Sequence, residues 1–445
     1  CLPLRAAAAA AGRDTVIERR SLERLAQLAP PLPDPWPAEA RALLAALLET
    51  GPPAVAVIEA LDQRGLWVRV VPEWEPVRSR PQRNAYHRFT VDRHLLEAAA
   101  NAAGLQHRVE RPDLLVIGAL LHDIGKGRPG DHTEVGMVLA QAITTRMGFP
   151  PEDVADLVAM VEHHLLLPTV ATRRDLDEPR TIEQVAHAVA TTQRLDLLAA
   201  LTEADSLATG PSAWGSWKAG LVDQLVQRVR RLLDPSVDPV PVAADGPEPL
   251  AGGNRRFEVT GDTLVVVDED RPGLFSKVAG VLALHGLEVL AASTGPSEPG
   301  WASSTFRVVD PRRDEPPWDR VQLDLHRVLD GRLAVRARLA ERSRTYRRPA
   351  PLASPTAATA ATVTFHDDAS SSSTVIDVHA ADGLGVLYRI TCALAELDLD
   401  IRSARAQTLG GTVVDAFYVR ARDGTKVDAA LQAEIELAIL DSLSG

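Results

Sequence analysis

Hydrophobic positions divide the 445-residue chain into a helical part and a later part that contains strands. From Val91 to about Leu233, apolar residues recur at the three- and four-residue spacing of amphipathic helices. No alternation of apolar and polar residues marks a strand there, so an all-α domain is predicted. The expected helices are 91–103, 114–121, 133–147, 151–163, 181–190, 194–208 and 214–233.

The first 85 residues are predicted to form short helices separated by prolines. The expected helices are 15–28, 38–49 and 53–62. Five prolines in residues 30–37 predict a stiff, extended connector between the first two. We therefore expect a helical linker region over 1–85, whose role is packing, followed by the main helical domain over 86–235.

A different pattern begins after a proline- and glycine-rich linker over 234–253. Short apolar runs now alternate with one helical segment at a time, in the order β-α-β-β-α-β. This is the ferredoxin-like arrangement, and we place this domain at 255–343. Its expected elements are strand 263–267, helix 272–285, strands 287–293 and 302–309, helix 314–329 and strand 333–339.

The same pattern then recurs over 373–445, after a second linker rich in Arg, Pro, Ala, Thr and Ser. Asp270 and Gly273 reappear 112 residues later as Asp382 and Gly385. The expected elements are strand 374–380, helix 385–397, strands 401–409 and 412–420, and helix 426–442. No fourth strand is evident, so either a strand is missing or the sheet takes its edge from elsewhere. The fold class predicted is a multidomain chain, all-α and then two α+β repeats.

Charge and composition exclude several classes of partner. The chain has 48 basic and 60 acidic residues, a net charge of -12, which argues against a broad surface for nucleic acid backbone. Its two cysteines, Cys1 and Cys392, are too few for a disulfide framework and fit a reducing cytoplasm. No window of 18 apolar residues could span a membrane. We therefore expect a cytoplasmic protein that binds neither nucleic acid nor membrane.

Histidines concentrate in the helical domain, which contains seven of the twelve between residues 87 and 164. The apolar run 114–121 ends at the pair His122-Asp123, and Lys126 follows between two glycines. Imidazole nitrogen and carboxylate oxygen suit zinc, manganese, iron or magnesium. An isolated pair would more simply be a surface feature at a helix end. A shared metal explains the accompanying candidates better: His94, His132, His163, His164 and Asp205.

The order of His94, His122-Asp123 and Asp205 resembles the HD superfamily of metal-dependent phosphohydrolases. His132 and the doublet His163-His164 are similar to the versions that hold two metals. The resemblance implies one or two divalent cations, Mg²⁺ or Mn²⁺ with Zn²⁺ or Fe²⁺ not excluded, that activate water for attack on phosphorus. It further implies catalytic roles for Asp123 and Lys126. Arg173 and Arg174 could bind the substrate phosphate, or form a solvated basic loop.

A narrower resemblance covers residues 50–443. Segments 86–94, 127–134, 163–167, 201–205 and 214–218 resemble the bifunctional enzymes that add and remove uridylyl groups on the PII nitrogen-signalling protein. The two repeats look like ACT domains. The resemblance implies hydrolytic removal of UMP or AMP from a tyrosine of PII, controlled by glutamine. The expected glutamine-binding residues are Asp270, Gly273, Leu274, Asp382, Gly385 and Val386; generic strand-to-helix turns are the alternative.

One departure from the family pattern concerns the transferase. The family begins with a nucleotidyltransferase domain that carries a Gly-Ser loop and paired aspartates, and residues 1–85 supply neither. We expect this chain, which starts at Cys1, to be a C-terminal part that retains the removing activity and the sensor. Two alternatives stay open: an HD phosphohydrolase acting on a free nucleotide, (p)ppGpp or a cyclic dinucleotide, and a non-catalytic ACT-based amino-acid sensor.

Overall fold

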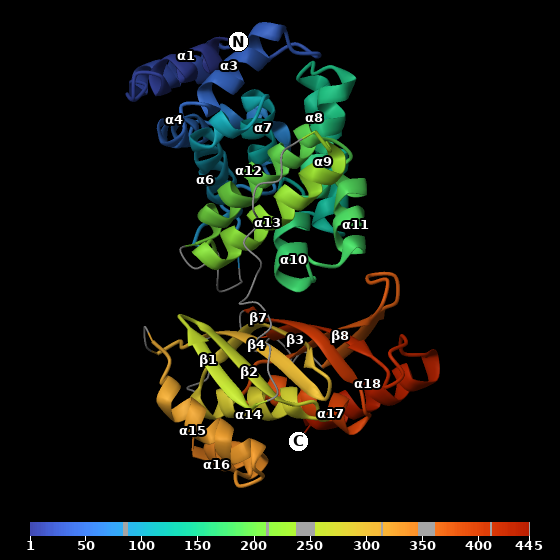
Figure 1. Cartoon of the computed structure of the whole chain (residues 1–445). Helices are drawn as coiled ribbons and strands as arrows, with labels where there is room; N and C mark the ends of the chain where they lie inside the picture. The colour runs from blue at the N-terminus through green and yellow to red at the C-terminus, as the bar shows by residue number, and fades with distance from the viewer. Residues whose placement is uncertain are drawn as a thin grey trace. The chain divides into compact units, whose positions relative to one another are not determined.

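The computed structural model describes residues 1–82, 88–210, 213–236, 254–312, 315–345, 361–409 and 412–444. Contacts divide the described residues into two compact units. The helical unit comprises residues 1–171 and the described residues from 182 to 236 (Figure 1). The sheet unit comprises residues 172–181 and the described residues from 254 to 444. Each unit is described by itself below.

The N-terminal part of the helical unit consists of short helices, as the prolines predict. They are α1 (Leu2–Ala11), α2 (Arg19–Leu28), α3 (Ala38–Leu48), α4 (Pro52–Asp62), α5 (Trp67–Val70) and the 3₁₀ turn η1 (Pro72–Trp74). The indoles of Trp67 and Trp74 are fully buried and meet edge to face, with ring centroids 5.9 Å apart. Such pairs add about 1 kcal/mol beyond area burial. This region is therefore packed on its own aromatic core.

The rest of the helical unit confirms the all-α prediction, because no strand occurs in its described residues. Its helices are α6 (Val91–Gly104), η2 (Gln106–Arg108), α7 (Pro112–Leu121), α8 (His132–Arg146), α9 (Pro151–Glu162), α12 (Thr192–Thr209) and α13 (Ser216–Leu233). Two further helices, α10 (Leu166–Arg173) and α11 (Pro179–Val189), adjoin the segment 172–181.

Helix α7 is the central helix of this unit. Every residue from Leu114 to Leu121 is buried, which accounts for its apolar character on all faces. It packs against α6, α9 and α12. Helices α6 and α12 carry His94 and Asp205, so the packing of the apolar run places His122 and Asp123, which follow it, near those two residues.

No single helix among the described residues is long and apolar enough to cross a bilayer. Two bent pairs of helices, α3 with α4 and α9 with α10, are together long and apolar enough by length and composition alone.

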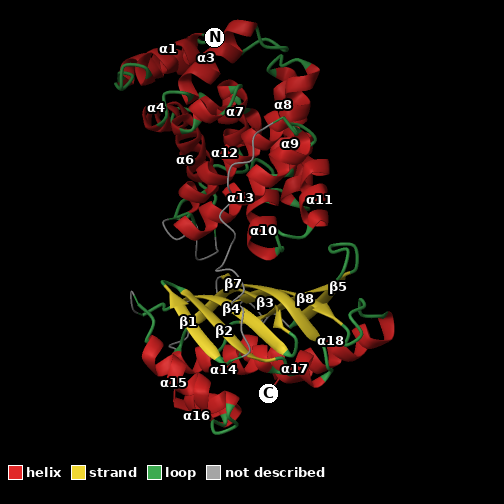
Figure 2. Ribbon diagram, viewed as in Figure 1, coloured by secondary structure: helices red, strands yellow, loops and turns green. Residues whose placement is uncertain are grey.

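The sheet unit contains one eight-stranded antiparallel sheet in the order β1-β2-β4-β3-β7-β8-β6-β5 (Figure 2). The strands are β1 (Arg256–Thr260), β2 (Thr263–Glu269), β3 (Glu288–Glu298), β4 (Trp301–Val309), β5 (Thr362–His366), β6 (Thr374–Ala381), β7 (Asp400–Leu409) and β8 (Thr412–Arg420). The helices are α14 (Leu274–His285), α15 (Trp318–Leu329), α16 (Val335–Thr345), α17 (Val386–Glu396) and α18 (Ala429–Ser444). The two repeats join where β3 pairs with β7, for instance Ala292 opposite Ala404.

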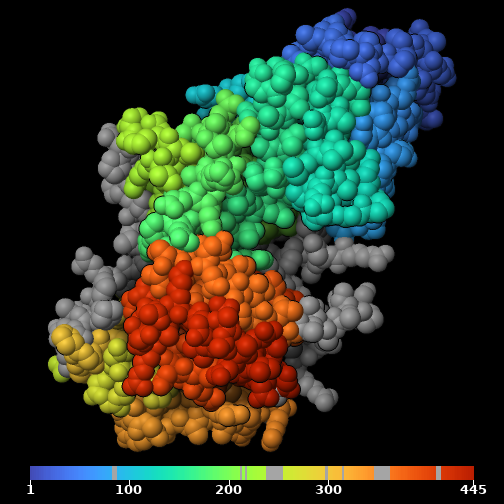
Figure 3. All heavy atoms as spheres, turned by 90° about the vertical axis from the view of Figure 1, so that its right-hand side faces the viewer, coloured from blue at the N-terminus to red at the C-terminus, as the bar shows by residue number. Residues whose placement is uncertain are grey.

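The two repeats share one packing scheme. Helices α14 and α17 lie on the same face of the sheet and contact each other. A single apolar core runs beneath them through both repeats and includes the equivalent residues Phe306 and Phe417. In the space-filling view the atoms of the second repeat, coloured orange to red, pack as one continuous body (Figure 3). The internal repeat inferred from sequence is thus confirmed as a structural repeat.

The fold class is confirmed, but the position of the fourth strand differs from the prediction. Residues 333–339 were expected to be a strand, and instead α16 begins at Val335. Val335 and Leu339 are both buried, so their four-residue spacing presents one helix face. The fourth strand precedes each repeat, as β1 in the first and as β5, inside the expected linker, in the second. Each repeat therefore has the order β-β-α-β-β-α, and the first repeat has α16 in addition at its end.

Residues 172–181 belong to the sheet unit although helices of the other unit flank them in sequence. The guanidinium of Arg174 pairs with both carboxylate oxygens of Asp377, at 2.7 and 2.9 Å. The amide of Asp175 donates to the hydroxyl of Tyr418 at 2.8 Å. The carboxylate of Glu178 accepts from the hydroxyl of Ser370 at 2.5 Å. These bonds fix the segment to the second repeat.

Candidate metal centre

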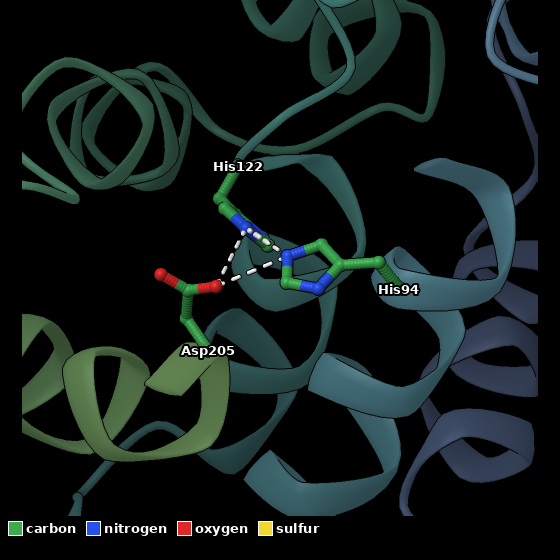
Figure 4. Close-up of side chains that lie close together, drawn as sticks. All are labelled: His94, His122 and Asp205. Atoms are coloured by element: carbon green, nitrogen blue, oxygen red, sulfur yellow. Dashed lines mark hydrogen bonds and ion pairs between the residues drawn. The ribbon is translucent and has the colours of Figure 1, made fainter. Parts of the chain in front are cut away.

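Three helices bring a first group of ligand atoms together. His94 comes from α6, His122 follows the last residue of α7, and Asp205 comes from α12. The Nε2 atoms of His94 and His122 lie 3.3 Å apart, and Asp205 Oδ1 lies 3.0 Å from the former and 3.5 Å from the latter (Figure 4). All three side chains point toward one point, and both imidazoles are buried. This arrangement can hold one divalent cation.

A second group lies beside the first and consists of Asp123, His132 and His164. Asp123 Oδ1 lies 3.9 Å from the Nε2 of His132 and 3.8 Å from that of His164. His132 is the first residue of α8, and His164 lies just beyond the end of α9. The resemblance to HD domains that hold two metals therefore has a geometric counterpart in two groups of ligand atoms.

Asp123 lies between the two groups. Its Oδ2 is 3.8 Å from His94 Nε2 and 3.5 Å from His122 Nε2, whereas its Oδ1 faces the second group. Oδ1 is buried and has no hydrogen-bond partner among the described residues. Because an unsatisfied buried carboxylate oxygen is costly, this atom fits a cation better than it fits the protein alone.

Backbone carbonyls orient two of the imidazoles. His122 Nδ1 lies 2.8 Å from the carbonyl oxygen of Ala119, and His164 Nδ1 lies 2.7 Å from that of Val161. A carbonyl oxygen can only accept, so each Nδ1 carries the hydrogen and donates. With the hydrogen on Nδ1, each ring in its neutral form presents the lone pair of Nε2 to the centre, as metal ligation requires.

The electrostatics of the centre keep its carboxylates ionised. Burial alone would raise the pKa of Asp123, but His122, Lys126 and His164 lower it to about 2. The pKa of Asp205 is likewise held well below its usual value by hydrogen bonds from His122 and His94, against the effect of burial. Burial and the neighbouring charge of His122 lower the pKa of His164. Ionised carboxylates and a neutral His164 are the protonation states that bind cations.

Lys126 supplies a positive charge at the more open side of the centre. Its Nζ lies 2.5 Å from Asp123 Oδ2 and donates to Gln82 Oε1 at 3.0 Å. The Lys126 side chain is 24% exposed, whereas that of Asp123 is 5% exposed, so the ammonium is the more solvent-accessible member of this ion pair. Gln82 was not predicted from the sequence, and no motif there singles it out.

The loop between Asp123 and His132 depends on close backbone contact at Gly125. A Cβ at this position would lie 2.0 Å from the carbonyl oxygen of His132 and 2.6 Å from the amide nitrogen of Gly136. Only glycine allows the start of α8 to approach the loop this closely. Gly125 therefore brings His132 toward Asp123. Gly136, four residues after His132 on α8, is its packing partner.

His163 is the one predicted histidine ligand that lies outside both groups. Helix α9 ends at Glu162, and His163 occupies the cap position, where its Nε2 lies 3.9 Å from the carboxylate of Glu162. Adjacent residues cannot both face one point without a change of backbone direction. The geometry therefore selects His164 of the doublet.

The predicted phosphate ligands Arg173 and Arg174 fall in the sheet unit. The ion pair of Arg174 with Asp377 occupies its guanidinium, so a role in phosphate binding would compete with that pair.

The side chain of Lys218 was part of the resemblance but not of the predicted site. Its Nζ donates to Ser206 Oγ at 3.2 Å, one residue from Asp205, and burial lowers its pKa while Asp205 opposes the shift.

The predicted effector turns each place a glycine with positive φ before a helix. Gly273 and Gly385 have φ of +84° and +74° and precede α14 and α17. Leu274 and Val386, the first helical residues, are buried, whereas Asp270 is exposed and Asp382 half-buried. The turn at Gly385 packs near Leu339 of α16. Helix N-termini at both turns offer backbone donors to a carboxylate.

Comparisons with known proteins agree with this architecture. The chain matches the HD domain family over residues 91–210 and the ACT domain family over 263–317. It is 42% identical, over 99% of its length, to the "Bifunctional uridylyltransferase/uridylyl-removing enzyme" of Streptomyces coelicolor. The chain belongs to this family. A relative of the same name from Mycobacterium tuberculosis strain H37Rv is 42% identical over 94% of the chain, and one from Ruegeria pomeroyi is 30% identical over 87%.

The matches place the two units within longer relatives. The chain spans 59% of the Streptomyces relative and 54% of the Mycobacterium relative. The HD match contains every ligand of both groups, from His94 to Asp205. The family membership and the structure together thus establish an HD domain with two groups of candidate metal ligands, followed by two structural repeats of which the first matches the ACT domain.

Proposed function

We propose that the chain hydrolyses the bond between a nucleotidyl group, UMP or AMP, and a tyrosine of the PII signalling protein. The observation that carries the proposal is the position of Asp123, one carboxylate shared by two converging ligand groups. The printed name of the relatives, which includes uridylyl removal, supports the choice of reaction. Glutamine bound at the ACT repeats would control the rate.

The residues of both groups fit divalent cations. The first group offers two imidazoles, Asp205 and one oxygen of Asp123; the second offers two imidazoles and the other oxygen. This mixed nitrogen and oxygen set favours Mn²⁺, Fe²⁺ or Zn²⁺, because Mg²⁺ prefers oxygen ligands. Bound cations would supply Lewis-acid activation of water and of the phosphoryl group.

The remaining contributions come from the side chains themselves. The carbonyls of Ala119 and Val161 hold His122 and His164 in place before substrate arrives, so orientation costs nothing at the moment of reaction. The ammonium of Lys126 would stabilise negative charge that develops on the phosphoryl oxygens. Burial of Asp123 strengthens each of these charge interactions, because the local dielectric is low.

The test is release of nucleotide from modified PII by the full chain loaded with Mn²⁺. His122→Ala and Asp123→Ala should each abolish release, and chelation of the metal should do the same. The matched control is His187→Ala, because His187 is exposed on α11 and lies outside both ligand groups. Full activity of the His122 variant would refute the metal-centre assignment.

The choice of substrate is tested in the same assay. PII carrying UMP and PII carrying AMP are compared with (p)ppGpp, a cyclic dinucleotide and free nucleotides. Preference for a free nucleotide would replace the proposal by another HD phosphohydrolase activity. Inactivity on every substrate, with metal bound, would favour a non-catalytic amino-acid sensor.

Glutamine control is tested by calorimetry on the full chain. Saturable binding that Gly385→Val weakens would support effector binding at the turn before α17, because the positive φ of Gly385 excludes a β-branched residue. Gly424→Val provides the control, since Gly424 also has positive φ but meets no atom within 4 Å. Absence of glutamine binding to the wild-type chain would refute the sensor.

A further inference from the structure

Helix α16, the additional helix of the first repeat, lies against the glycine turn of the second repeat. A Cβ on Gly385 would lie 3.2 Å from Cδ1 of Leu339, and its three nearest atoms would all belong to Leu339. This is closer than the roughly 3.5 Å at which carbon atoms normally meet. Leu339 therefore fills the space beside the glycine, where a ligand would have to approach the backbone of the turn.

The equivalent turn of the first repeat is more open. A Cβ on Gly273 would lie 3.5 Å from Ser276 Oγ, one turn along its own helix, and 4.0 Å from the Cβ of Ala395. Gly273 is half-buried, whereas Gly385 is buried. The two glycines have similar φ, +84° and +74°. The two turns therefore differ in accessibility although their backbones have the same conformation.

Gly280 on α14 makes room for α16. A Cβ at this position would lie 2.6 Å from Cγ1 of Val335 and 2.7 Å from Cδ2 of Tyr388. Only glycine leaves space for both neighbours at such distances. The second repeat has Cys392 at the equivalent position, 112 residues later. The two repeats thus differ in sequence at the place where α16 packs on the first of them.

Helix α16 is attached through few apolar side chains. Within its described residues 335–344, only Val335 and Leu339 are buried; the former packs on α14 and the latter on the turn at Gly385. The helix has 11 residues, and isolated helices shorter than about 12–15 residues are marginally stable in water. Elements with few buried contacts open at a low cost in free energy. Loss of the Leu339 contact would therefore loosen the helix.

We propose that α16 covers the effector turn of the second repeat, and that an effector binds this turn only when Leu339 has left Gly385. The inference rests on the proposed binding of glutamine at the two turns. A ligand that needs the uncovered turn shifts the equilibrium toward molecules in which α16 is displaced. Its apparent affinity is reduced by the fraction of molecules that are uncovered. The two turns would consequently differ in affinity, and occupation of the second would release α16.

Tryptic cleavage of the full chain measures the release of α16. Arg336 and Arg338 are exposed on this helix, and a protease cleaves a helix through its transiently opened form. Saturating glutamine should raise the initial rate of cleavage after these two arginines by roughly threefold or more, with the fragments assigned by mass spectrometry. Arg327 on α15, with a side chain 47% exposed, is the control in the same digest, and its cleavage rate should not change.

Calorimetric titration with glutamine tests the affinity of the covered turn. Leu339→Ala should bind glutamine roughly fivefold or more tightly at one class of sites, because more molecules are uncovered. Its α16 should be cleaved rapidly with or without glutamine. Leu325→Ala is the matched control: Leu325 is also buried but lies on α15, so the melting temperature should fall while the glutamine affinities stay unchanged. The milder Leu339→Val should shift affinity and cleavage in the same direction as Leu339→Ala, and serves if the alanine variant unfolds.

The outcomes distinguish this proposal from the sensor on which it rests. Glutamine binding that is equal in the wild type and the Leu339 variants would overturn the cover and leave the sensor intact. Binding that leaves cleavage after Arg336 and Arg338 unchanged, or slows it, would do the same. Absence of glutamine binding to the wild type and to both variants would refute the sensor, and the cover with it.

Discussion

Replacement of Gly125 by alanine tests whether close backbone contact builds the second ligand group. The new Cβ would lie 2.0 Å from the carbonyl oxygen of His132 and 2.6 Å from the amide of Gly136, and both are backbone atoms that cannot rotate away. Reaching ordinary van der Waals contact near 3.5 Å requires the start of α8 to withdraw by roughly 1 Å or more. His132 would then move away from Asp123.

Two magnitudes follow from that displacement. Overpacking typically lowers the free energy of unfolding by 1–3 kcal/mol, and because the neighbours of Gly125 are rigid we expect a loss of about 3 kcal/mol. For a unit of this size the melting temperature should fall by roughly 6–12 °C. Metal ligands tolerate distance errors of only about 0.2 Å, and misplacement by 1 Å lowers rates about 100-fold, so activity should fall by that order.

The assay combines thermal melting, Mn²⁺ titration and nucleotide release on the full chain. Gly125→Ala should lose or weaken binding at one cation site and retain the other, because His94, His122 and Asp205 do not depend on α8. Gly220→Ala is the matched control: its Cβ meets no atom within 4 Å, and on α13 it should stabilise by up to about 1 kcal/mol. If Gly125→Ala melts, binds two cations and turns over like the wild type, the reasoning is wrong.

Three further predictions concern other parts of the chain. Arg174→Ala leaves the half-buried carboxylate of Asp377 without its bidentate partner and should destabilise the sheet unit by about 3 kcal/mol. Denaturant unfolding measures this loss, and an unchanged unfolding midpoint would contradict the prediction. In the metal-free chain the pKa of Asp123 is lowered from 3.8 to about 2, so the ionised carboxylate adds roughly 2 kcal/mol to the free energy of unfolding above pH 4. This stabilisation is lost as the pH falls toward 2. Asp123→Asn should therefore flatten the acidic part of the pH–stability curve, and an unaltered curve would contradict the prediction. Leu339→Ala should lower the free energy of unfolding by about 2–3 kcal/mol because Leu339 is buried on α16, whereas Arg338→Ala should leave it unchanged. Equal melting temperatures of the two variants would mean that α16 does not pack as described.

Local patterns in the sequence were sufficient for most elements of the fold. Helix periodicity predicts α6 to α9, α12 and α13 within a few residues, because a buried apolar face imposes its spacing on the chain. Equivalent positions such as Asp270 and Asp382 reveal the repeat, since the same strand-helix turn demands the same residues twice. The signals for β1 and β5 were also present, as the alternation of Phe257 with Val259 and of Val363 with Phe365, but each run has only five residues.

Residue types at the candidate centre could likewise be read from the sequence, but their division into two groups could not. Which member of the doublet His163-His164 faces the centre depends on where α9 ends, and a helix end shifts with tertiary packing. The bridging position of Asp123 requires five helices, α6, α7, α8, α9 and α12, to converge, and the contribution of Gly125 depends on the approach of α8.

The sequence alone thus determined most of the elements, that they repeat, and which side chains are candidates to hold metal. Tertiary structure decided which strand completes each repeat, that Arg174 is bound to Asp377, and that Arg312 and Arg342 both lie beside Gly286. The physical reason is the range of the interactions. Periodicity and turn chemistry act over a few residues, whereas shared ligands, ion pairs and side-chain packing join residues that are distant in the chain.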